Sequence, residues 1–95
     1  MALVLRGETP CLLCGRPLMV DEEIEGFPEF LKPTHKLGRF SDAAMHSACF
    51  RRSPERATVA EIYGRWLAIW ATRPGDLTSP EEIAAWARDA FKDFA

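Results

Sequence analysis

Apolar residues follow a helical spacing over the second half of the chain. They recur three or four positions apart between residues 53 and 73, at Val59, Ile62, Tyr63, Trp66, Leu67 and Trp70. Residues with this spacing share one face of a helix. Ser53 followed by Pro54 is typical of a helix start, and Pro74-Gly75 is typical of a stop. The pattern therefore predicts a helix over residues 53–73.

A second apolar stripe follows after a clear start signal. Ser79-Pro80-Glu81-Glu82 has the form of a capping box with proline in the first helical turn. The stripe itself consists of Ile83, Trp86, Ala87, Ala90, Phe91 and Phe94. We expect this last helix to pack with the preceding one as an antiparallel pair. Most of the aromatic side chains of the two helices are expected in the core, because they bury the most area per residue.

The first 52 residues read differently, as short apolar runs separated by proline and glycine. Residues 3–5 and 18–20 are strand candidates, and 27–40 is expected to be an ordered, irregular loop whose aromatic residues fold back onto the core. Ser41 or Asp42 is expected to cap a helix that ends near Arg52, because Pro54 disfavours helix at the residue before it.

Taken together, these elements predict an α+β fold in one domain spanning residues 1–95. A half made of short strands, a knuckle and a helix covers 1–52, and a two-helix half covers 53–95. A chain of 95 residues with 47% hydrophobic content buries a real but small core. An additional covalent or metal constraint would therefore matter for stability.

All three cysteines and one histidine fall into two close pairs, Cys11-x-x-Cys14 and His46-x-x-Cys49. An odd number of cysteines in this spacing favours a metal over disulfides. Three thiolates and one imidazole form a complete tetrahedral set for one structural Zn²⁺, with no position left for water. Gly15 suits the turn after Cys14, since it adopts a positive φ without strain. Asp42 is expected to be either a helix cap or a hydrogen-bond partner for the free imidazole nitrogen of His46.

The residues around these pairs carry a resemblance. Cys11-Leu-Leu-Cys14-Gly15, followed by His46-Ser-Ala-Cys49-Phe50, resembles the first half of a LIM domain and, more broadly, a treble-clef zinc finger. The resemblance covers about residues 10–52. The second zinc module of a LIM domain has no ligands here and the insert is longer, so the chain is not a LIM domain. The resemblance implies a zinc-binding, protein-binding role, and the pattern is also similar to that of small bacterial zinc-binding proteins.

Three other functions use similar residues. Arg51, Arg52 and Arg56 form a basic cluster suited to nucleic-acid phosphates. However, the net charge is −2 and the chain has neither Asn nor Gln, the usual readers of adenine. A nuclease of the HNH type, a metal-dependent hydrolase on a treble clef, would need a spare histidine, and only His35 remains. A thioredoxin-like redox site would need the CxxC motif within a βαβ unit, which the pattern does not show.

The sequence thus favours a non-enzymatic zinc-binding module that binds another protein, as an adaptor, a regulator or an immunity-type protein. The acids of residues 21–29 would suit a basic partner. The first residues lack the apolar stretch of a secretory signal, and no apolar run reaches the roughly 18 residues of a membrane helix. Thiolate ligands suit a reducing compartment, so the expected location is the cytoplasm.

Overall fold

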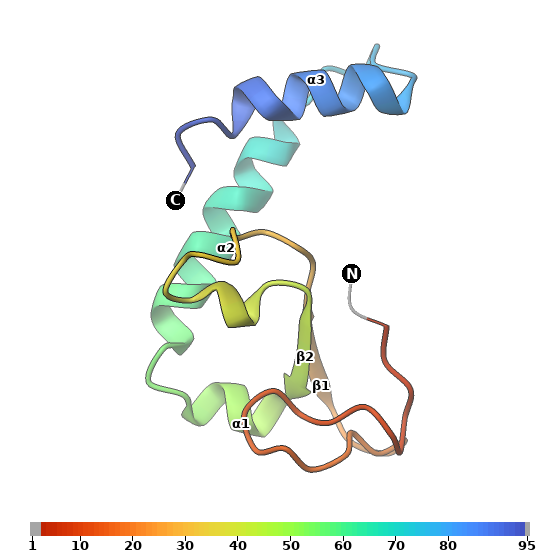
Figure 1. Cartoon of the computed structure of the whole chain (residues 1–95), viewed down its shortest axis with the longest axis vertical. Coiled ribbons are helices and arrows are strands. Elements are labelled where there is room, and N and C mark those ends of the chain that lie inside the picture. Colours follow the sequence, from red (N-terminus) through yellow and green to blue (C-terminus); the bar gives the residue numbers. More distant parts are fainter. Residues whose placement is uncertain (1–2, 95) are drawn as a thin grey trace. The chain divides into compact units, whose positions relative to one another are not determined.

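A two-stranded sheet precedes the α-helices in this protein, for which a computed structural model describes residues 3–94. The elements in chain order are β1 (Ile24–Phe27), the 3-10 helix η1 (Gly38–Phe40), β2 (Ala43–His46), α1 (Ser47–Arg52), α2 (Arg56–Ala71) and α3 (Pro80–Ala90) (Figure 1). The fold is therefore α+β, as predicted. The chain forms two compact units, one up to Ala60 and one from Glu61 onward.

β1 and β2 form an antiparallel pair in which Ile24 lies opposite His46 and Phe27 opposite Ala43. All four residues of β2 are buried. The prediction of a helix from Ser41 or Asp42 is therefore wrong for residues 41–46. Alanine and methionine are good helix formers, but helix propensity is worth little energy per residue, and pairing with a neighbouring strand overrides it. Asp42 takes a φ of 51°, outside the right-handed helical region, and it does not cap a helix.

The segment before β1 is held by turns rather than by strands. The predictions of strands at 3–5 and 18–20 are wrong. In their place, Pro10 and Pro17 form an isolated bridge, and the Gly7 N–H donates to the Leu18 carbonyl at 2.7 Å. Proline lacks the N–H that a regular ladder needs, so a bridge flanked by two prolines does not extend into a strand.

The insert between β1 and β2 folds back onto the core, as predicted. Its buried side chains are Phe30, Leu31, Leu37 and Phe40, which join Phe27 of β1 and Phe50 of α1. The Ser41 hydroxyl accepts the N–H groups of Phe30 and Leu31, at 2.9 and 3.2 Å. A Cβ at Gly38 would lie 2.7 Å from the Lys32 carbonyl oxygen, so this closure requires glycine.

The capping residues explain where α2 and α3 begin. α2 begins at Arg56, later than the predicted start at Ser53, which instead caps the C-terminus of α1. The predicted capping box of α3 is confirmed. The Glu82 N–H donates to the Ser79 hydroxyl at 3.1 Å, and the Ser79 N–H donates to the Glu82 carboxylate at 3.3 Å.

The aromatic residues of the second unit form one cluster where α3 meets α2. Trp70 packs against Trp86 and Phe91, with ring centroids 5.4 and 5.6 Å apart, and Trp66 packs against Phe91 at 6.1 Å. These rings are half-buried rather than fully buried. The contacts pair the earlier residue of α2 with the later residue of the α3 segment, Trp66 with Phe91 and Trp70 with Trp86, which is the order expected of an antiparallel pair. No helix within residues 3–94 has the length and apolarity needed to cross a bilayer.

Candidate metal centre

The four predicted ligands, far apart in sequence, meet at one point in the first unit. One ligand atom from each of Cys11, Cys14, His46 and Cys49 lies within 4.8 Å of the other three. Cys11 and His46 are buried, Cys49 is half-buried and Cys14 is exposed. The convergence predicted from the two pairs is therefore confirmed, and the cluster is compatible with binding one metal ion.

The first pair sits on a tight knuckle. The Cys11 N–H donates to the Arg16 carbonyl at 2.8 Å, and the Gly15 N–H donates to the Cys11 carbonyl at 3.0 Å. Gly15 has a φ of 79°, which confirms the predicted need for a positive value at this position. The knuckle is attached to the sheet, because the Leu12 N–H donates to the Ala44 carbonyl at 3.1 Å.

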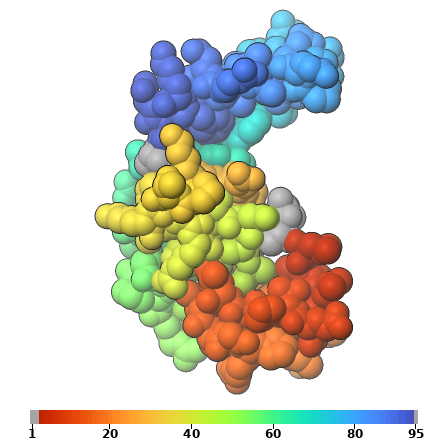
Figure 2. Space-filling view, in the orientation of Figure 1, coloured from red at the N-terminus to blue at the C-terminus, as the bar shows by residue number. Residues whose placement is uncertain are grey.

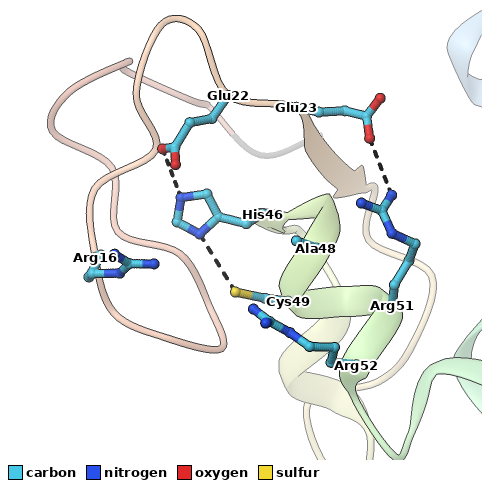
Figure 3. Close-up of a pocket in the computed structure, with 8 residues that line it drawn as sticks. All are labelled: Arg16, Glu22, Glu23, His46, Ala48, Cys49, Arg51 and Arg52. Atoms are coloured by element: carbon cyan, nitrogen blue, oxygen red, sulfur yellow. Dashed lines mark hydrogen bonds and ion pairs between the residues drawn. The ribbon is translucent and has the colours of Figure 1, made fainter.

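The second pair sits where β2 passes into α1. His46 ends the strand with an extended backbone, and Cys49 lies in the first turn of α1. The prediction that both residues lie on one face of a helix is therefore wrong. The strand-to-helix transition still directs both side chains toward the knuckle. Figure 3 shows the His46 ring between Glu22 on one side and Cys49 on the other.

The spacing of the donor atoms fits a tetrahedral ion. The His46 Nδ1 lies 3.4 Å from the Cys14 sulfur and 3.7 Å from the Cys49 sulfur. Zinc bonds of about 2.3 Å to sulfur and 2.0–2.1 Å to nitrogen place S and N about 3.6 Å apart on a tetrahedron. The two measured distances lie on either side of that value. The donor set and its spacing therefore fit the group that the sequence implies.

Backbone N–H groups surround the most buried ligand. The Cys11 sulfur accepts from the N–H groups of Leu13, Cys14 and His46, at 3.4, 3.5 and 3.4 Å. Burial alone would raise the pKa of Cys11, but these N–H groups outweigh it and lower the pKa to about 6. The N–H of Arg16 likewise lowers the pKa of Cys14. Thiolates, not thiols, ligate metals, so the knuckle favours the ligand form at neutral pH.

Glu22 fixes the orientation of the histidine ligand. Its carboxylate lies 2.9 Å from the His46 Nε2, which leaves Nδ1 facing the sulfurs. Burial alone would lower the pKa of His46, but the contacts with Glu22 and the cysteines outweigh it and raise the pKa. Asp42 does not take this role, so that alternative is wrong. Sequence reasoning missed Glu22. The one signal that could have indicated it is its acidic side chain, located between the two ligand pairs, because carboxylates commonly accept the free N–H of a ligand histidine.

Hydrogen bonds from the Met19 N–H and from the His46 ring favour the charged form of Glu22. The Met19 N–H, and after it the His46 ring, lowers the pKa of Glu22 below its ordinary value of 4.5. The stabilisation by this carboxylate is therefore complete above about pH 4.5 and is lost as the pH falls through the lowered folded pKa. At neutral pH the ring faces a full negative charge.

Glu22→Gln is expected to weaken zinc binding by about 10- to 100-fold, because the amide keeps an oxygen near Nε2 but loses the charge that supports the ligand. Competition with a chromophoric chelator at pH 7 measures this affinity. Glu23→Gln is the matched control, since its carboxylate pairs with Arg51 at 3.3 Å instead. Equal affinities for the two variants would contradict the role given to Glu22.

A cavity of about 230 Å³ opens beside the cluster (Figure 3). Arg51 and Arg52, two of the three arginines predicted as phosphate contacts, line it together with Arg16, Glu22 and Glu23. The carboxylates offset much of the positive charge at this point. His35, the spare histidine of the nuclease alternative, is not among the clustered ligands, and its Nδ1 accepts the Leu37 N–H at 3.0 Å within its own loop.

Comparisons with protein-family models, with curated proteins and with solved structures gave no match to this chain. Its function is therefore inferred from the geometry of the cluster and the surface around it.

Proposed function

We propose that this chain is a small zinc-binding protein in which one structural Zn²⁺ holds a protein-interaction module in shape. The observation that carries the proposal is the closed Cys₃His cluster, with all four donors supplied by the chain. Four protein ligands leave no coordination position for water, whereas catalytic zinc sites keep one open. The same cluster supports a cytoplasmic location, because thiolates persist in reducing compartments.

The local architecture supports a treble-clef arrangement for this module. A knuckle carries Cys11 and Cys14, an antiparallel strand pair follows, and a short helix carries Cys49. A unit of about 60 residues is only marginally stable on its apolar core alone, so metal binding is expected to contribute much of its stability. Structural zinc contributes on the order of 10 kcal/mol in comparable small motifs.

The surface of the same unit supports an interaction role. Leu3, Leu5, Met19 and Val20 are large apolar side chains with exposed fractions of 82, 51, 47 and 79%. Single exposed apolar residues are common, but a group of them in neighbouring segments is typical of binding surfaces. The exposed apolar side chains of this unit therefore support a role in binding another molecule.

Metal analysis and partner capture test the proposal. Protein purified without a histidine tag is expected to contain one zinc per chain. Cross-linking in its native cells is expected to yield one stoichiometric protein partner. In an electrophoretic mobility-shift assay at physiological salt, the protein is expected not to change the mobility of nucleic acid. Nucleic-acid binding with a steep salt dependence that Arg52→Ala flattens would instead assign the alternative function to Arg51, Arg52 and Arg56.

A further inference from the structure

The turn from Met19 to Glu22 presents apolar side chains to solvent in a fixed conformation. The Glu22 N–H donates to the Met19 carbonyl at 3.2 Å, which places Val20 and Asp21 at the corner of the turn. Turn corners favour Gly, Pro, Asn, Asp and Ser, so a valine with 79% of its surface exposed has no local reason to be there. Its side chain is available for contact with another molecule.

Arg6 clamps both ends of this turn. Its Nη1 donates to the Met19 carbonyl at 2.7 Å and to the Glu22 carbonyl at 2.8 Å. The segment that carries Arg6 runs beside the one that leads into the turn, because the Gly7 N–H donates to the Leu18 carbonyl at 2.7 Å. Leu5, which is 51% exposed, directly precedes Arg6 in this segment. The apolar side chains of Leu5, Met19 and Val20 therefore belong to two segments that lie side by side. Figure 2 shows the first of these segments, in red, at the surface.

The metal centre is connected to the same turn. Glu22 is the last residue of the turn, and its carboxylate accepts the Met19 N–H at 2.9 Å while contacting the His46 Nε2 at 2.9 Å. His46, one of the clustered ligands, thus contacts the last residue of the turn, and Arg6 binds the carbonyls at both ends of the turn. A surface that is already ordered before binding loses little entropy when a partner docks.

Charge indicates which partner fits this surface. Residues 5–25 contain five carboxylates against Arg6 and Arg16. Two of the five are engaged, Glu22 with His46 and Glu23 with Arg51, while Glu8, Asp21 and Glu25 are exposed. The cation of Arg6 is already engaged with two backbone carbonyls. Acidic residues around an apolar centre attract a basic partner and repel anionic membranes and nucleic acids.

We infer that Leu5, Met19 and Val20, with Glu8 and Asp21 at their edge, form a docking surface for a basic, apolar segment of a partner protein. This inference rests on the proposed function and specifies the chemistry of its partner. The apolar side chains supply affinity, and the carboxylates select lysine- and arginine-rich segments and speed their association. The metal keeps the surface in its binding conformation through His46 and Glu22.

The test uses the zinc-loaded full chain and a synthetic amphipathic peptide made only of leucine and lysine. In a ¹⁵N NMR titration, the shifts are expected at residues 5–8 and 19–23, with a Kd below about 1 mM that rises with salt. Val20→Ser is expected to weaken binding about tenfold, the loss of one buried apolar side chain. Because Val20 is exposed, this variant keeps the fold. Leu67→Ser, at 47% exposure on α2, is the control and should leave the Kd unchanged.

Several results would overturn the inference. These are shifts centred elsewhere, equal effects of the two serine variants, equal binding of a leucine–glutamate peptide, or no shift at about 1 mM peptide. Shifts of residues 19–23 on dilution of the protein alone would assign the surface to a second copy. The same shifts with phosphatidylcholine vesicles would assign it to a membrane. If a captured partner bound Val20→Ser with unchanged affinity, the proposed function would stand, but this surface would not be its docking site.

Discussion

Replacement of Cys11 by serine is expected to unfold the unit up to Ala60 at 25 °C. Cys11 is 2% exposed, and its sulfur is surrounded by three N–H groups. Losing one thiolate abolishes tight zinc binding, which contributes on the order of 10 kcal/mol in small zinc motifs. Whole domains are stable by only about 5–15 kcal/mol, so little stability remains. Circular dichroism, ¹⁵N NMR and metal content measure the outcome.

The control for this variant is Ala48→Ser, which introduces the same residue between His46 and Cys49 at an exposed, non-ligating position. It is expected to keep one zinc per chain and a nearly unchanged melting temperature. If Cys11→Ser also kept its zinc and its melting temperature, the structural role of the metal would be refuted. Chelation of zinc from the native chain should reproduce the spectrum of the Cys11 variant.

Phe40→Ala is expected to lower the free energy of unfolding of the zinc-loaded protein by about 3–5 kcal/mol, the range for deletion of a buried phenylalanine. Phe40 is 0% exposed and packs edge-on against Phe50 with centroids 6.4 Å apart. It holds the insert that separates the two ligand pairs against the sheet and α1. Urea denaturation followed by ¹⁵N NMR of residues up to Ala60 gives this free energy.

A graded variant separates the effect of volume from a general loss of folding. Phe40→Leu keeps most of the apolar side chain and is expected to cost less than about 1.5 kcal/mol, provided the neighbours repack. Equal stabilities of the alanine and leucine variants would show that the insert does not depend on this side chain for packing.

The metal cluster was predictable because the two ligands of each pair lie close together in the sequence. Each ligand pair is separated by two residues, so local backbone geometry alone brings its two donors together. Because the chain has three cysteines, a fourth ligand was needed, and His46, three residues before Cys49, was the residue placed to supply it. The capping box at Ser79 was predictable for the same reason, since all its hydrogen bonds lie within four residues.

The features that sequence reasoning missed depend on contacts between distant segments. Residues 43–46 have helix-favouring side chains, yet they form a strand because Ile24–Phe27 lies alongside them. Glu22 contacts His46 only because that hairpin places residues 22 and 46 at the same end of the sheet. No local pattern distinguishes Glu22 from its acidic neighbours Asp21 and Glu23. Pairing register, which the sequence does not reveal, selects among them.

The division of the chain has a consequence for spectroscopy. Trp66, Trp70 and Trp86, the three indole fluorophores, all lie after Glu61, whereas every metal ligand lies before Ala60. Ultraviolet excitation at the red edge of protein absorption therefore yields emission from the second unit alone. A change in emission maximum when zinc is withdrawn would report energetic coupling across α2. A constant emission maximum would show that zinc removal does not alter the second unit. The native tryptophans thus allow this measurement without an added label.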